Sequence, residues 1–183
     1  TTGSMKYMIR SIENQEFINT NTQIRGEYNH KSRYFVSGGF AVSAFQAAAV
    51  SCIRAGGSCI YDTRHNTAQT LTSYEITHAS FLIHKLIEIL ESLPDGFQKP
   101  ASLHILTLGA PVSDSVRQKV LTSLASNISE TYGTNESSTI STIGASGEGV
   151  LLLGVDVEIV DDNDAPLTGS SGWIAKLPGM GGT

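Results

Sequence analysis

Three short stretches of the chain combine glycine with small, hydroxyl or charged side chains. The first, TTGSMK, opens the sequence. Its backbone amides can curl around an anion, and Lys6 is placed to neutralise that anion. The spacing is not that of a Walker A loop, which needs GxxxxGK[ST] ahead of a helix. A flexible terminus therefore stays open as the alternative.

The second stretch, LGAPVS, bends at Gly109 and Pro111 around the small Ala110. Such a bend lets a flat ring lie against the backbone. It is equally the shape of an ordinary turn between a strand and a helix.

The third stretch, ETYGTNESS, gathers an aromatic ring, a glycine, hydrogen-bonding side chains and a carboxylate in one turn. Tyr132 could stack on a base, and Thr134 and Asn135 could reach a phosphate. Glu136 could hold a hard cation such as Mg²⁺, because that ion prefers oxygen ligands. The alternative is a polar surface turn with a solvated glutamate.

Alternating helix and strand patterns must position these stretches. Helices are expected over 11–25, 40–54, 66–72 and 82–92, with a further helix capped by Ser113. Strands are expected at RYFVS, SCIYD, YEITHAS, SLHILTLGA and ISETYG. This alternation with short connections predicts an α/β fold, a parallel sheet covered by helices on both faces. Ligands of such sheets bind beyond the carboxyl ends of the strands, where the second and third stretches fall.

The pattern changes near residue 144. VDVEIV alternates apolar and acidic residues as a half-exposed strand does, and DDNDAPLTG is typical of a turn. We therefore expect an α/β nucleotide-binding unit over residues 1–143 and the start of a β-rich unit over residues 144–183.

Composition excludes several function classes. The chain has 183 residues, of which 40% are hydrophobic, enough for a core. The net charge is −5 and the basic residues are scattered, so we expect no nucleic-acid partner and no membrane partner. Cys52 and Cys59 lack CxxC spacing, which argues against a disulfide framework or a zinc site and favours a cytoplasmic location. The histidines, likewise, show no metal-binding spacing.

The order of the three stretches resembles that of the adenylate-forming (AMP-binding) superfamily, which includes acyl- and aryl-CoA synthetases, luciferase and the adenylation domains of nonribosomal peptide synthetases. TTGSMK is similar to the second half of the family's phosphate loop, TSGTTGxPK. LGAPVSDSVRQKV resembles GGAPLSPELxExV, and ETYGTNES resembles xGYGxTE. GEGVLLLGVDVEIVDDNDAPL is similar to GxPLPGVEVRIVDDDGxPL. The resemblance covers nearly the whole chain and implies a flavodoxin-like sheet.

The resemblance implies a role for each stretch. The loop that holds the β- and γ-phosphates of ATP would comprise Thr1, Thr2, Gly3, Ser4 and Lys6. The nucleotide would also contact Gly109, Ala110, Pro111, Tyr132, Gly133 and Thr134, with the tyrosine stacked on the purine.

Three residues are implied to be catalytic. Glu136 would bind Mg²⁺, Asn135 would contact the α-phosphate, and Lys6 would neutralise phosphate charge. The acid would lie in a pocket framed by Ser37, Gly38, Phe40, Leu108 and Gly144.

The activity implied is that of an ATP-dependent carboxylic acid ligase. Such an enzyme activates a small-molecule acid as acyl-AMP and passes it to the thiol of CoA or of a phosphopantetheine carrier protein. The resemblance also implies that these residues are a fragment of the family's large domain that is inactive alone. Met5, Ser37 and Asn135 depart from the family's pattern, so a non-catalytic, flavodoxin-like binding or interaction module derived from that family is the alternative.

Overall fold

The computed structural model describes residues 9–40, 42–63, 65–134, 137–144 and 149–166, together with the backbone of residues 175 and 176. Its helices are α1 Ile12–Arg25, α2 Ser43–Arg54, α3 Thr67–Ser73, α4 Ile83–Glu91 and α5 Asp114–Ser123. Its strands are β1 Arg33–Phe35, β2 Ser58–Ile60, β3 His78–Leu82, β4 His104–Leu108, β5 Asn127–Thr134, β6 Ser138–Ile143, β7 Gly149–Leu151, β8 Glu158–Ile159 and β9 Ala175–Lys176.

The first seven of these strands form one sheet in the order β2-β1-β3-β4-β5-β6-β7. The strands from β2 to β5 are parallel. β6 and β7 each run antiparallel to the strand before them. The parallel part has the flavodoxin-like order, in which the winding direction changes between β1 and β3. A ligand is expected at the carboxyl ends of the strands beside that point.

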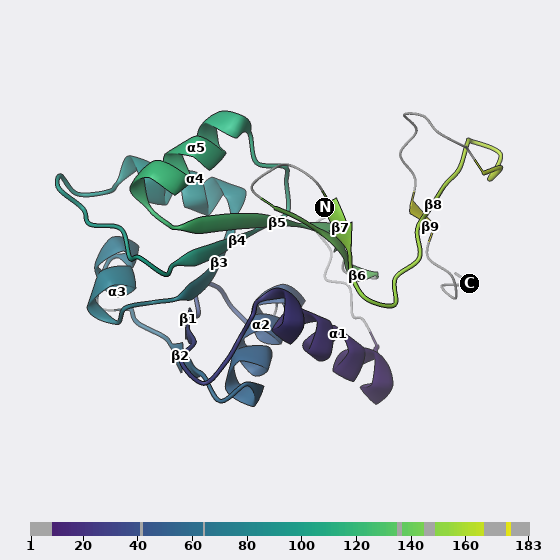
Figure 1. Ribbon diagram of the computed structural model, residues 1–183, viewed down its shortest axis with the longest axis horizontal. Helices are drawn as coiled ribbons and strands as arrows, with labels where there is room; N and C mark the ends of the chain where they lie inside the picture. The colour runs from purple at the N-terminus through teal and green to yellow at the C-terminus, as the bar shows by residue number, and fades with distance from the viewer. Residues whose placement is uncertain are drawn as a thin grey trace.

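Helices cover both faces of the sheet (Figure 1). α4 and α5 lie side by side on one face, and α1 and α2 lie side by side on the other. The larger hydrophobic core includes Leu86, Val120 and Leu124 from helices or helix ends, packed with Ile105 and Ile128 of the sheet. The predicted α/β class, with a parallel sheet between helices, is confirmed.

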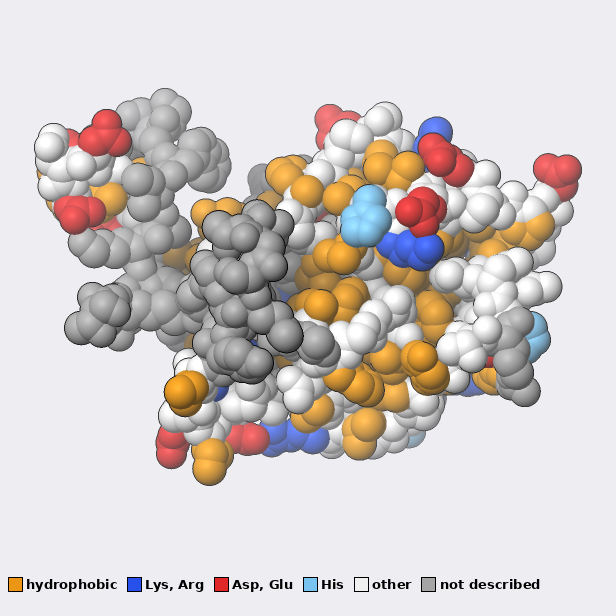
Figure 2. All heavy atoms as spheres, turned by 180° about the vertical axis from the view of Figure 1, so that it is seen from behind, with side chains coloured by type: hydrophobic (Ala, Val, Ile, Leu, Met, Phe, Trp, Pro, Cys, Tyr) orange, Lys and Arg blue, Asp and Glu red, His pale blue; other side chains and the backbone are white. Residues whose placement is uncertain are grey.

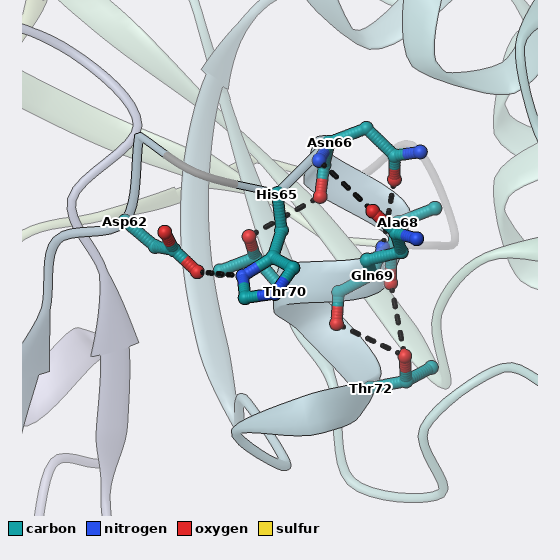
Figure 3. A network of polar contacts seen from close by, with 7 residues as sticks. All are labelled: Asp62, His65, Asn66, Ala68, Gln69, Thr70 and Thr72. Carbon is teal, nitrogen blue, oxygen red and sulfur yellow. Dashed lines mark hydrogen bonds and ion pairs between the residues drawn. The ribbon is translucent and has the colours of Figure 1, made fainter.

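Helix starts are stabilised by side chains close in sequence. Ser11 and Ser113 each accept a hydrogen bond from the N–H three residues further on. Asn66 and Gln69 form a reciprocal capping box at the start of α3 (Figure 3). Because these contacts are local, the helix starts could be predicted well from sequence.

Two predicted element boundaries are wrong. The strand expected from Tyr74 begins at His78, because Tyr74 ends α3 and Glu75 turns the chain with φ +49°. The helix expected from Phe40 begins at Ser43, because the residue before Ser43 is extended.

The sheet extends past residue 143, since β7 pairs with β6. β8 and β9 form a separate antiparallel pair. Within the acidic turn beyond β8, Asp161 Oδ1 accepts hydrogen bonds from the N–H groups of Asn163 and Ala165, at 2.8 and 2.9 Å. The division into units of residues 1–143 and 144–183 stays a prediction.

Charged side chains are dispersed among hydrophobic and uncharged ones on the face seen in Figure 2. In the part of the chain that the structure describes, no helix is long and apolar enough to cross a membrane. Cys52 and Cys59 are free thiols.

Candidate functional site

A groove of about 560 Å³ opens beside the carboxyl ends of β3, β4 and β5. The sheet side of the groove includes Leu82, Leu108, Gly109, Thr131, Gly133 and Thr134. The opposite side includes Arg10, Ile18, Thr22 and Arg25 from α1 and the residues before it, and Val42 and Ala47 from the start of α2. Because α2 follows β1, the groove lies at the point where the winding of the sheet changes.

The turn after β4 is exposed, as the sequence predicts for a ligand-binding bend. Gly109 has φ +92°, a backbone conformation that residues with a side chain rarely adopt. Ala110 and Pro111 are exposed beside it. The turn ends at the buried Val112, whose N–H donates to Glu130 Oε2 at 3.0 Å. The bend is thus open to solvent and anchored to β5.

Successive side chains of β5 point to opposite faces of the sheet. Thr131 and Gly133 line the groove on the side of α1 and α2. Glu130 pairs with Arg117 of α5, so Tyr132 lies on the α5 side as well. Half of Tyr132 is exposed, at 50%. Tyr132 therefore lies on the α5 side, where Val112 anchors the end of the turn after β4, whereas Gly109 at the start of that turn lines the groove.

Gly133 and Thr134 have structural roles in the hairpin between β5 and β6. A Cβ on Gly133 would lie 2.0 Å from the Ser138 carbonyl oxygen, where the strand register shifts at a bulge. The Thr134 hydroxyl lies 3.0 Å from that of Ser137 and also accepts from the Ser137 N–H at 3.0 Å. These contacts account for a glycine and a threonine here before any ligand is considered.

Sequence reasoning missed a buried ion pair between Arg117 and Glu130. The two side chains are only 7% and 8% exposed, and Arg117 Nη1 also donates to the Gly144 carbonyl at 3.1 Å. An arginine beside the apolar face of α5 and a glutamate on the same face of β5 as Ile128 were the signals that could have revealed it. The pair joins α5, β5 and the end of β6.

The residues of the predicted acid pocket lie at different places in the structure, and their role stays a prediction. Leu108 lines the groove, whereas the other four predicted residues are not among its described lining residues. The Ser37 hydroxyl donates to the Ser80 carbonyl. Gly38 packs under the ring of Phe45, Phe40 is 58% exposed, and Gly144 accepts from α5.

Several predicted residues lie outside the described part of the chain: Thr1, Thr2, Gly3, Ser4, Lys6, Asn135 and Glu136. Their roles stay predictions. Among the residues that the structure does describe, no group of three histidine, cysteine or acidic residues could hold a metal ion.

Sequence reasoning also missed Arg25, the last residue of α1. Its side chain lines the groove, and its Nη1 is buried without a hydrogen-bond partner in the part of the chain that the structure describes. Burial lowers the pKa of the Arg25 guanidinium, but an arginine stays charged near neutral pH.

Two histidines lie near Arg25 around an inner cavity of about 10 Å³. Burial, reinforced by the neighbouring His104, lowers the pKa of His78 to about 4. Burial also lowers the pKa of His104, whose Nε2 lies 2.8 Å from the Ser129 hydroxyl. Both imidazoles are therefore neutral near pH 7.

The sequence matches no protein-family model and no curated protein sequence. The fold does match solved structures. One is an o-succinylbenzoate CoA synthetase from Bacillus subtilis, solved with its acyl-adenylate intermediate, with a TM-score of 0.75 and 19% identity over 90% of this chain and 45% of that one. The same synthetase has been solved with ATP and a magnesium ion.

Two further matches broaden the comparison. An amide bond synthetase from Marinactinospora thermotolerans has a TM-score of 0.69 and 16% identity over 85% of this chain and 35% of that one. A nonribosomal peptide synthetase protein with adenylation and PCP domains has a TM-score of 0.63 and 14% identity over 79% of this chain and 28% of that one. The chain thus spans less than half the length of these proteins. Such identities establish likeness of fold, and the chain has the fold of the adenylate-forming enzymes that its sequence motifs resemble.

Proposed function

We propose that the chain is part of an ATP-dependent carboxylic acid ligase. The observation that carries this proposal is that Tyr132 and the turn at Gly109–Pro111 lie near the carboxyl ends of the neighbouring strands β5 and β4, beside a groove. The protein would join an acid to AMP, release pyrophosphate and pass the acyl group to the thiol of CoA or of a carrier protein. The matched CoA synthetase, solved with ATP and magnesium and with an acyl-adenylate, supports this assignment.

The residues beside the turn fit an adenine ring. Gly109 has no side chain, Ala110 has a small one, and both are exposed. Tyr132 offers a half-exposed ring on the neighbouring strand for stacking. These residues would hold the base, while Lys6, Asn135 and Glu136 would meet the phosphates and Mg²⁺, as the family resemblance implies.

The groove would hold the acid. A carboxylate oxygen of the acid attacks the α-phosphorus of ATP, and the bond from that phosphorus to the pyrophosphate oxygen breaks. The protein's contribution is chiefly alignment and charge neutralisation, which need no general base. Ile18, Ala47 and Leu108 supply apolar lining for the carbon skeleton.

Pyrophosphate release tests the proposal. The full-length protein that contains this chain should release pyrophosphate with Mg-ATP and one class in a panel of aryl, short-chain, long-chain and amino acids. Tyr132→Ala should raise KM for ATP about tenfold, because base stacking contributes about 1–3 kcal/mol. Tyr61→Ala is the matched control, since Tyr61 is a 75% exposed tyrosine that follows another parallel strand, β2.

The competing hypothesis predicts a different result. If the protein binds ATP but releases no pyrophosphate with any acid of the panel, the result would favour a non-catalytic nucleotide-binding module. Equal effects of the Tyr132 and Tyr61 variants on KM for ATP would remove the proposed adenine site. We expect the 183 residues alone to form no acyl-adenylate.

A further inference from the structure

Arg25 differs from the other arginines that the structure describes. Arg33, Arg54 and Arg117 form ion pairs with glutamates, and Arg10 also has an interaction partner. Arg25 forms no ion pair with any described residue and keeps a buried Nη1 without an acceptor. A buried charged donor without a partner costs folding free energy, so its position beside a cavity points to a ligand.

The carbonyl end of α1 compensates for only part of this cost. Arg25 is in the last turn of the helix, where the helix dipole favours a positive charge. The dipole explains why the charge is tolerated in the free protein. It supplies no acceptor for Nη1, which leaves that hydrogen bond available to a bound group.

Arg25 lies at the inner end of the groove. Thr22 and Arg25 line both the groove and the inner cavity. The cavity is lined by His104, the first residue of β4. The groove is lined by Gly109, which directly follows Leu108, the last residue of β4. Five strand residues span roughly 17 Å, so an acid whose reacting carboxylate lies near Gly109 would extend its far end toward Arg25.

The described lining of the groove is positively charged although the chain as a whole carries −5. Arg10 and Arg25 line it, and none of its described lining residues is acidic. Around the inner cavity, His78 and His104 are neutral near pH 7, and burial raises the pKa of Tyr28 so that its hydroxyl stays uncharged. Arg25 is therefore the one formal charge among the described residues that line this cavity; the carboxylate of Glu27, which acts to raise the pKa of His104, lies outside that lining.

We propose that the groove selects an acid with a second anionic group, a dicarboxylic acid in the simplest case, and that Arg25 binds the second carboxylate. The inference rests on the proposed ligase function. A guanidinium suits a carboxylate because its N–H groups form charge-assisted, often bidentate hydrogen bonds.

The test compares acids of equal length in the full-length protein. Pyrophosphate release is measured with aliphatic and aryl dicarboxylic acids and with their monoamides, which lack the second charge. We expect kcat/KM to be about ten- to a hundredfold higher for the diacid, because hydrogen bonds to charged groups contribute on that scale. Arg25→Met should reduce the ratio of diacid to monoamide to about one, and Arg25→Lys should keep part of it.

Arg54→Met is the control, since Arg54 is an exposed arginine of α2 that pairs with Glu16 outside the groove. That variant should leave the ratio at its wild-type value. Equal use of diacid and monoamide by the unaltered protein would overturn the inference, as would an unchanged ratio in a folded Arg25→Met protein.

A failure of the ligase function gives a distinct result, namely no pyrophosphate release with any acid. Titration calorimetry of the diacid and the monoamide, without ATP, then decides about Arg25. Binding of the diacid that Arg25→Met abolishes supports the anion site. Absence of any diacid binding to the wild-type protein overturns it.

Discussion

Arg117 and Arg25 lie on opposite sides of the same sheet and differ in their hydrogen bonding. Arg117 pairs with Glu130 and donates to the Gly144 carbonyl, whereas Arg25 keeps an unpartnered Nη1 beside the groove. A buried arginine with its partners supplied by the protein holds elements together. A buried arginine that lacks such acceptors can donate its free hydrogen bonds to a bound ligand.

The same contrast extends to the surroundings of the two arginines. On the α5 side, Glu130 also accepts from the Val112 N–H, so one carboxylate anchors both a helix and the turn after β4. On the α1 side, the neighbouring His78 and His104 are neutral near pH 7, and none of the described residues that line the groove or the inner cavity is acidic. One side therefore supports the predicted nucleotide turn with paired charges, and the other side holds the groove that we propose for the acid.

The largest expected effect comes from removing the ion pair between Arg117 and Glu130 on the α5 side. Glu130→Ala should lower the free energy of unfolding by about 3–5 kcal/mol, because it leaves Arg117 buried without its anion. Urea denaturation of the purified protein measures this change. Glu130→Gln, which keeps the shape and an acceptor for Val112, should lose less, and equal losses for the two variants would show that the charge pairing is unimportant.

On the α1 side, the titration of His78 should make the stability of the protein depend on pH. The pKa of His78 is about 4 in the folded protein, below its ordinary value of 6.5. Between these values the unfolded chain binds a proton that the folded chain does not, so stability is lost as pH falls from 6.5 toward 4. Since the ring is not completely buried, we expect a loss on the order of 2 kcal/mol.

Denaturant midpoints at pH 7 and pH 4.5 for the wild type and for His78→Gln measure this contribution. The wild type should lose more stability than the variant over that interval. Parallel curves for the two proteins would mean that His78 does not titrate as its surroundings predict.

The smallest expected effect is a gain in stability. Arg25→Met removes an unpaired buried charge and keeps much of the apolar stem, so it should raise the free energy of unfolding by about 1–2 kcal/mol in the absence of ligand. Thermal denaturation without added acid measures it. A loss as large as that of Glu130→Ala would mean that the protein itself supplies a partner for Arg25.

Much of the fold could be predicted because its determinants are local. Ser11 and Ser113 cap helices through residues three positions away, and the apolar spacing of α5 predicts the buried Val120 and Leu124. The bend at Gly109 was predicted from a glycine and a proline that flank one small residue. The boundary at Tyr74 was predicted wrongly, because the positive φ of the following Glu75 leaves no mark in the pattern of apolar residues.

The sequence by itself determined the α/β alternation, the exposed turn after β4 and the family that the motifs resemble, since each depends on neighbours along the chain. Only the tertiary structure decided that the strand of Tyr132 lies next to that turn and that Glu130 meets Arg117. It alone also left Arg25 Nη1 beside a groove without a hydrogen-bond partner among the described residues. The physical reason is that charge pairing and solvent access depend on which distant elements pack together, and strand order sets that packing.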